Sequence, residues 1–143
     1  MHRYLLDTDV LIDILKGHAP TVLAFQRLPP ESATAYSVVS EAELYVGVPD
    51  LDGPEREALV TLLAAMESIP VDSAVARLAG QYRRRHGATA GTSLPDALIA
   101  ASAHFGGAAL VTRNRKHFPM DDVRVIAPED IAHDSGTTAP PPH

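Results

Sequence analysis

The sequence predicts an α/β fold, with a central, mostly parallel sheet of four to five short strands flanked by helices. Short apolar runs alternate along the chain with segments whose apolar residues recur at helical spacing. The 143 residues, 45% of them hydrophobic, suffice for one sizeable core but not for two domains. The sequence has no cysteine, which excludes disulfide scaffolds, thiolate zinc sites and cysteine nucleophiles.

The first part of the chain predicts two strands and two helices. Tyr4–Leu6 is an apolar run that we expect as a strand, followed by a helix over Thr8–Lys16 that Gly17 ends. The next helix covers Pro20–Leu28, because proline is tolerated in a first helical turn. Ala33–Ser37 then predicts a second short strand.

The middle of the chain is expected to be helical. A helix over Ser40–Val48 begins with serine as its N-cap. Pro54–Glu67 and Val71–His86 have the spacing of two further helices, which together predict a helical hairpin with Pro70 at the joint. Gly87–Ser93 consists mostly of small residues and predicts a loop.

The last part predicts one helix, two strands and a tail. The helix covers Pro95–Phe105, and the strands cover Ala109–Val111 and Val123–Ile126. The folded domain therefore spans residues 1–132. Residues 133–143 end in GTTAPPPH and contain too few apolar side chains to pack, so we expect a disordered, proline-rich tail.

The N-terminal segment gives no sign of export or membrane insertion. In MHRYLLDTDVLIDIL the apolar run is short and broken by acids, which fits neither a secretion signal nor a transmembrane span. We therefore expect a cytoplasmic protein without a membrane partner.

The charge distribution leaves two interpretations open. A net charge of −6 argues against phosphate binding, yet half of the twelve basic residues fall in two short stretches, Arg83–Arg85 and Arg113, Arg115 and Lys116. These stretches could form two phosphate-contacting rims around an acidic, metal-binding centre. Alternatively, the first is the solvated end of a helix, where cations suit the helix dipole.

Several acids interrupt apolar stretches, where an uncompensated carboxylate is costly. Asp7 stands at the carboxyl end of the first strand, which is the edge where α/β sheets bind ligands. Asp9 is near enough to share its site, and a divalent cation would compensate both charges. The alternative is that Thr8 or Asp9 merely caps the helix and that Asp13 lies at the surface.

Two glutamates, Glu41 and Glu43, lie on one helix but point in roughly opposite directions. Glu43 is the better candidate for a site, because Gly47 lies one turn later on the same face and leaves room for a ligand. The alternative is a solvated surface glutamate.

Asp96 is the one acid in SLPDALIAASAHF, a segment of small and apolar residues that predicts a buried helix. It is a third candidate for the acidic site. A structural role is equally consistent, with Ser93 as N-cap, Pro95 in the first turn and Asp96 favouring the helix N-terminus.

The segment LVTRNRKHF predicts a buried strand that ends in polar residues. Thr112 and Asn114 could bond a phosphate oxygen or a water at the site, or could satisfy a tight turn. His117 is expected to be a surface or packing histidine rather than a ligand.

Together, the four segments resemble the motifs of PIN-domain ribonucleases of the VapC toxin type. LLDTDVLID is similar to the opening motif, ELYVGV to the glutamate motif, PDALIAA to the third acidic motif and LVTRNRKHF to the last. The resemblance covers roughly residues 3 to 128. It implies an endoribonuclease that needs Mg²⁺ or Mn²⁺, forms a homodimer and is silenced by a cognate VapB antitoxin.

Position by position, the resemblance implies a role for each candidate. Asp7, Glu43 and Asp96 would bind the metal, while Asp9 would orient the attacking water. The remaining implied site residues are the hydroxyl of Thr112, Asn114, and the RNA-contacting cations Arg113, Arg115 and Lys116. Many members have an aspartate at the position of Asn114 or His117. This chain has no aspartate at either position, so a fourth carboxylate is missing and a second metal site is not expected.

Two other functions fit parts of the sequence. LLDTDV also matches the opening motif of haloacid-dehalogenase-type phosphatases, with Asp7 as nucleophile and Asp9 as acid and base. That family needs a later strand ending in paired acids, whereas Asp121 and Asp122 follow no clear strand. A catalytically weak RNA- or protein-binding module is the other alternative.

Overall fold

The computed structural model describes residues 2–48 and 52–134. Within these residues, five strands form one sheet in the order β3-β2-β1-β4-β5, and every neighbouring pair is parallel. The prediction of an α/β fold on a mostly parallel sheet is therefore confirmed. The strands are β1 (Arg3–Leu6), β2 (Ala33–Ser37), β3 (Glu67–Ile69), β4 (Ala109–Val111) and β5 (Val125–Ile126).

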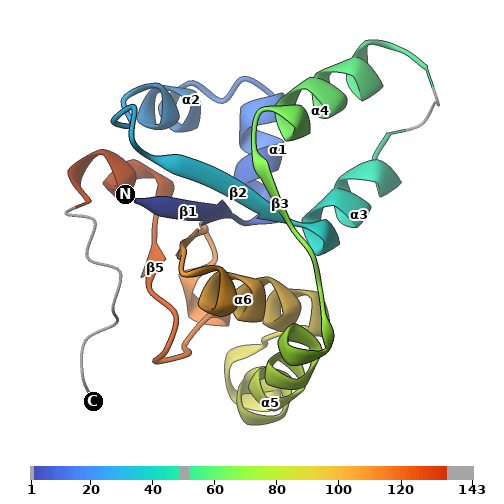
Figure 1. Cartoon of the computed structure of the whole chain (residues 1–143), viewed down its shortest axis with the longest axis vertical. Helices are drawn as coiled ribbons and strands as arrows, with labels where there is room; N and C mark the ends of the chain where they lie inside the picture. The colour runs from blue at the N-terminus through green and yellow to red at the C-terminus, as the bar shows by residue number, and fades with distance from the viewer. Residues whose placement is uncertain (1, 49–51, 135–143) are drawn as a thin grey trace.

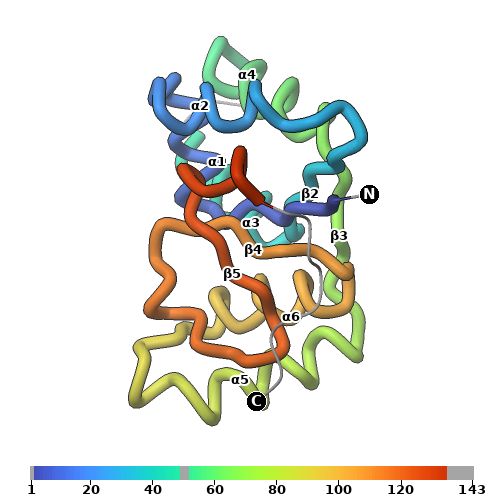
Figure 2. Tube along the Cα trace, turned by 90° about the vertical axis from the view of Figure 1, so that its left-hand side faces the viewer, coloured from blue at the N-terminus to red at the C-terminus, as the bar shows by residue number. Residues whose placement is uncertain are grey.

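Helices cover both faces of the sheet. The α-helices are α1 (Thr8–Leu15), α2 (Ala19–Gln26), α3 (Val38–Val46), α4 (Pro54–Ala64), α5 (Ser73–Ala90) and α6 (Leu94–Gly106). Figures 1 and 2 show α1, α2 and α4 on one side of the sheet and α5 and α6 on the other. Two 3-10 helices follow the last strands, η1 (Arg115–His117) and η2 (Pro128–His133). In the described part of the chain, no helix combines the length and apolarity needed to cross a membrane.

The central strand β1 is buried on both faces. Side chains alternate along a strand, so Tyr4 and Leu6 enter the core under α1, α2 and α4, while Leu5 enters the core under α5 and α6. This explains why the strand is an unbroken apolar run. Leu6 of β1 is in register with Val111 of β4, so the residues that follow these two strands emerge side by side.

The predicted helical hairpin around Pro70 is wrong. Glu67–Ile69 forms the edge strand β3, which pairs with β2 so that Ser37 lies opposite Ile69. Only Ile69 of the three residues is buried, so this strand leaves almost no apolar signal of its own. A short run that follows a helical pattern without a break is easily taken as its continuation.

Several other boundaries differ from the prediction, and two of them have a clear local cause. Ser37, not Ser40, caps α3, because its Oγ accepts a hydrogen bond from the N–H of Val39 at 3.1 Å. Of the loop predicted over Gly87–Ser93, the first four residues are helical instead, because α5 continues to Ala90, and only the last three connect α5 to α6. Helix α5 ends at Gly91, whose φ of +70° is the left-handed conformation that glycine adopts without strain.

The predicted tail falls mostly outside the described residues. His133 ends η2, and Asp134 lies at its C-cap. The carboxylate of Asp134 accepts hydrogen bonds from Tyr4 Oη at 2.7 Å and from Arg124 Nη2 at 2.9 Å. The domain boundary at residue 132 stays a prediction.

Candidate active site

Asp7 lies where β1 ends, and it connects three parts of the site. Its N–H donates to the carbonyl of Val111 at 2.9 Å, which continues the pairing of β1 with β4. Its Oδ1 accepts from the N–H of Thr8 at 2.8 Å and caps α1. Its Oδ2 accepts from Thr112 Oγ1 at 2.7 Å. Asp7 is only 6% exposed, as expected for an acid at the end of a buried strand.

Asp9 and Asp13 hold the loop after β4 against α1. Asp9 Oδ2 accepts from the backbone N–H of Arg113 at 3.2 Å, and Asp13 Oδ2 lies 3.2 Å from Arg113 Nε. Thr21 also donates to Asp13, at 3.3 Å. Asp13 is buried, so the expectation that it lies at the surface was wrong. The guanidinium of Arg113 compensates the charge of Asp13. The two residues are 100 positions apart, and no local pattern in the sequence predicts that they pair.

Glu43 reaches the site through Thr8. Thr8 Oγ1 lies 2.7 Å from Glu43 Oε1 and 2.9 Å from Ser40 Oγ. The structure therefore brings Glu43 to the first turn of α1, where it contacts Thr8, the residue that follows Asp7. Sequence reasoning considered Thr8 only as a cap and missed its role as the link between α1 and α3. Its position between two acids, in LLDTDV, was the one available signal.

Asp96 has the structural role that the sequence left open. Its N–H donates to Ser93 Oγ and its Oδ2 accepts from the N–H of Ser93, both at 3.1 Å, which is a capping box. His117 Nδ1 also lies 3.5 Å from Asp96 Oδ2. The negative charge of Asp96 also contributes to the raised pKa of Asp7, so its place in the acidic site stays a prediction that this interaction supports.

Thr112 closes the tight turn that its segment predicted and also contacts a site acid, while its bond to a phosphate or a water stays a prediction. Its hydroxyl donates to Asp7 and accepts from the N–H of Asn114 at 3.0 Å. The same hydroxyl therefore orients a site acid and closes the turn. Thr112 is fully buried, whereas Asn114 is exposed. The predicted cations Arg113, Arg115 and Lys116 are exposed beside it. Arg83–Arg85 are exposed too, on α5.

The acids in this group oppose each other's ionisation. Burial raises the pKa of Asp7 to about 7, and the negative charges of Asp9 and Asp96 add to this, against the hydrogen bonds from Thr112 and Thr8. Burial also raises the pKa of Asp9, which Arg113 partly offsets. A site that raises the pKa of its carboxyl groups in this way favours a cation that would compensate them.

The carboxylate oxygens of the site are ligands that suit a hard divalent cation, although the structure does not place them around a single ion position. Asp9 Oδ1 is buried and has no hydrogen-bond partner among the described residues, so it can bond a water that enters the site. In the same part of the chain, no three His, Asp or Glu side chains already surround one ion position. Glu43 uses only Oε1 to accept from Thr8, and Asp96 uses only Oδ2 to accept from Ser93, so each keeps a second carboxylate oxygen for an ion.

The sequence profile of the PIN domain matches residues 4–123, which include every acid of this site. The chain belongs to the PIN-domain family. Within it, the chain groups with the VapC ribonucleases, so the resemblance described above is confirmed. Ribonuclease VapC10 of Mycobacterium tuberculosis H37Rv is 38% identical over 120 residues, which cover 81% of this chain and 86% of that protein. Ribonuclease VapC19 of the same organism is 34% identical over 118 residues, covering 81% and 92%.

Solved structures of toxin–antitoxin complexes contain chains with the same fold. A toxin–antitoxin complex from Klebsiella pneumoniae matches with a TM-score of 0.71 at 27% identity, covering 87% of this chain and 97% of that one. DNA-bound VapBC from Salmonella typhimurium matches with a TM-score of 0.71 at 26% identity, covering 90% and 99%. VapBC2 from Rickettsia felis, bound to a promoter DNA fragment, has a TM-score of 0.75 at 24% identity, covering 87% and 98%.

Proposed function

We propose that this protein is a metal-dependent endoribonuclease toxin that hydrolyses RNA phosphodiester bonds. The observation that carries the proposal is the group of Asp7, Asp9, Glu43 and Asp96 at the carboxyl edge of the sheet, with the pKa of Asp7 raised to about 7. Burial and mutual repulsion disfavour the charged form of these carboxyl groups, and a bound Mg²⁺ or Mn²⁺ would compensate that charge. The curated relatives are named ribonucleases, which supports RNA as the substrate.

Each residue of the site has a role in this proposal. Asp7, Glu43 and Asp96 would hold one cation, which supplies hydroxide near neutral pH and neutralises charge on the phosphoryl oxygens. Asp9 orients the attacking water through its free Oδ1. Thr112 fixes the carboxylate of Asp7, and the turn at Asn114 depends on the same hydroxyl. Arg113, Arg115 and Lys116 contact the RNA backbone, which positions the substrate without choosing its sequence.

The experiment that tests this function is cleavage of a mixed cellular RNA pool with Mn²⁺, with Mg²⁺ and with EDTA. The matched variants are Glu43→Gln, in the site, and Glu41→Gln, on the other side of the same helix. We expect metal-dependent cleavage that falls about a hundredfold or more in Glu43→Gln and persists in Glu41→Gln. Folded protein, free of any antitoxin, that cleaves nothing with either metal would instead support the binding-module alternative.

Thr112→Val is expected to reduce RNA cleavage about 10- to 100-fold, since it removes the hydrogen bond that orients a metal-binding carboxylate. Valine has the shape of threonine, so the fold should survive. Thr112→Ser restores the hydroxyl and should recover most of the activity. Initial cleavage rates under saturating Mn²⁺ measure this, and equal rates for valine and serine would show that the hydroxyl has no such role.

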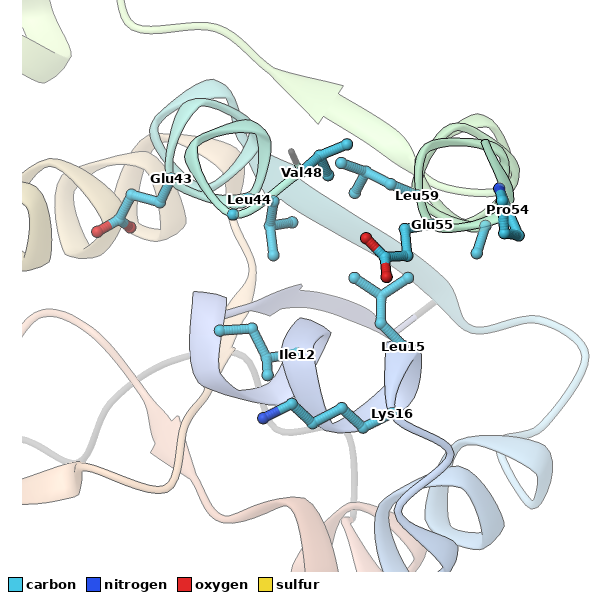
Figure 3. A pocket seen from close by; sticks show the side chains of 11 residues that line it. Ile12, Leu15, Lys16, Glu43, Leu44, Val48, Pro54, Glu55 and Leu59 are labelled. Atoms are coloured by element: carbon cyan, nitrogen blue, oxygen red, sulfur yellow. The ribbon is translucent and has the colours of Figure 1, made fainter. Parts of the chain in front are cut away.

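We propose that a VapB-type antitoxin silences the enzyme from the cleft next to Glu43. This cleft of about 630 Å³ lies between α1, α3 and α4, and Figure 3 shows Ile12, Leu15, Leu44 and Leu59 around it. Its apolar lining suits one face of an amphipathic helix. The charged residues of the lining are two acids, Glu43 and Glu55, and one base, Lys16, so the net negative charge favours a basic partner. An arginine from that partner would pair with the site acids in place of the metal.

Ala58→Trp is expected to weaken antitoxin binding at least a hundredfold, because the large side chain fills the cleft. Ala58 is exposed, so stability and RNA cleavage should change little. Calorimetric titration with a VapB-type protein that binds the unmodified chain measures the affinity. Unchanged affinity would place the antitoxin elsewhere. The homodimer and the cytoplasmic location both remain predictions. Light scattering of the purified protein gives the molecular mass that tests the homodimer.

A further inference from the structure

A second cleft, of about 610 Å³, opens beside the proposed active site. It is lined by Arg113–Lys116, from the segment after β4, and by Ala127, Glu129 and Asp130, from the segment after β5. These strands are parallel neighbours, with Val111 opposite Ile126, so both segments leave the same edge of the sheet. The cleft volume falls within the range of small-ligand sites.

One wall of this cleft is hydrogen-bonded to two residues of the proposed active site, Thr112 and Asp9. The N–H of Asn114 donates to Thr112 Oγ1, whose hydroxyl holds Asp7. The N–H of Arg113 donates to Asp9. A nucleotide in the cleft would therefore lie next to a phosphate positioned at the acids.

Opposite charges line the cleft without neutralising each other. Arg115 and Lys116 are exposed on η1, and Glu129 and Asp130 are exposed on η2. Within the described residues, none of these four side chains forms an ion pair or a hydrogen bond. All four are therefore available to a ligand that offers both negative charge and hydrogen-bond donors.

We infer that this cleft binds the nucleotide adjoining the scissile phosphate and that Glu129 and Asp130 select a base with exposed amino groups. The inference rests on the ribonuclease function proposed above. Cations alone would serve a backbone site, and carboxylates there would repel phosphates. Carboxylates only accept hydrogen bonds, and they pair with base donors.

Guanine fits this arrangement best. It presents N1–H and the N2 amino group together, so one carboxylate can accept both, whereas uracil offers only a single N3–H. Cytosine and adenine each present one amino group. The base must be unpaired, because base pairing hides these groups, so the expected substrate is a single-stranded loop or end.

The test is binding of fluorescein-labelled hexaribonucleotides in EDTA, where cleavage does not interfere. The probes are hexauridylate and the same strand with one central guanosine, adenosine or cytidine. Glu129→Ala/Asp130→Ala is compared with the control Asp52→Ala/Glu57→Ala, which removes the same charge from exposed positions at α4. Fluorescence anisotropy gives each affinity, and sequencing of RNA ends cut with Mn²⁺ gives the preference during cleavage.

We expect the unmodified protein and the control to bind the guanosine strand about tenfold or more tightly than hexauridylate. The Glu129/Asp130 variant should lose this preference and bind hexauridylate at least as well as before, because two negative charges leave the RNA path. Equal affinity of the unmodified protein for all four strands, or a preference that survives in the variant, would overturn the inference. A guanosine preference without any cleavage would contradict the ribonuclease function and leave base selection standing. Cleavage without any base preference would support the ribonuclease function and contradict base selection by Glu129 and Asp130.

Discussion

Asp7→Asn is expected to abolish RNA cleavage while making the metal-free protein more stable. Asp7 is held by Thr112 and Thr8 at the centre of the acidic group, so asparagine removes a principal metal ligand. A metal contributes several kcal/mol of transition-state stabilisation, and the expected loss is about a thousandfold or more. The rate of cleavage of one RNA substrate under Mn²⁺ measures this.

The gain in stability follows from the direction of the pKa shift of Asp7. In the folded protein this pKa is about 7, against 3.8 for an unperturbed aspartate. The unfolded chain therefore loses its proton at a lower pH, and Asp7 destabilises the fold increasingly as pH rises from about 4 to about 7. Asparagine has no charge, so it should raise the free energy of unfolding by up to about 4 kcal/mol at pH 8 and by less than about 2 kcal/mol at pH 5.

Urea unfolding in EDTA at these two pH values tests the shift. Glu41→Gln is the control, and its stability should be unchanged at both. Saturating Mn²⁺ should stabilise the unmodified protein and have little effect on Asp7→Asn, because only the former binds the ion. An Asp7→Asn protein less stable than the original at pH 8 would show that the carboxylate is already compensated without metal.

Leu5→Ala is expected to lower the free energy of unfolding by about 3 kcal/mol. Leu5 is fully buried in the central strand, between Ala35 of β2 and Leu110 of β4, and faces the core under α5 and α6. Its truncation leaves a cavity that the flanking strands cannot close, and such changes cost about 2–5 kcal/mol.

Val46→Ala is the matched control for Leu5→Ala. Val46 is 87% exposed at the end of α3, and its truncation should change stability by less than about 0.5 kcal/mol. Thermal unfolding of both variants measures the difference, and about 3 kcal/mol corresponds to a fall of roughly 10 °C for a chain of this size. A loss below about 1 kcal/mol in Leu5→Ala would contradict the central position of β1.

The sequence predicted the parts of the fold that have a strong local pattern. The apolar run of β1 followed by Asp7 located both the central strand and the edge that carries the site. By contrast, Glu67–Ile69 became a strand only through pairing with β2, and one buried isoleucine is too weak a signal for sequence reasoning.

The candidate site was predicted at the level of residues but not of contacts. Asp7 and Glu43 were identified from their positions, whereas the contact of Asp13 with Arg113 joins residues a hundred positions apart. Such a pair is decided by the register of β1 and β4, which is a tertiary property. The roles of the site residues and the domain boundary stay predictions, because only experiments with the protein test them.

The hydrogen bond between Thr112 and Asp7 spans 105 positions of the sequence. A ribosome therefore makes Asp7 more than a hundred residues before it makes the hydroxyl that holds this side chain. Until β4 and its following loop have emerged, β1 lacks the neighbour that pairs with it, and Asp7 lacks the hydroxyl that orients it. We therefore expect a nascent chain of the proposed nuclease to stay inactive beside the messenger and ribosomal RNA that surround it until the segment after β4 has emerged.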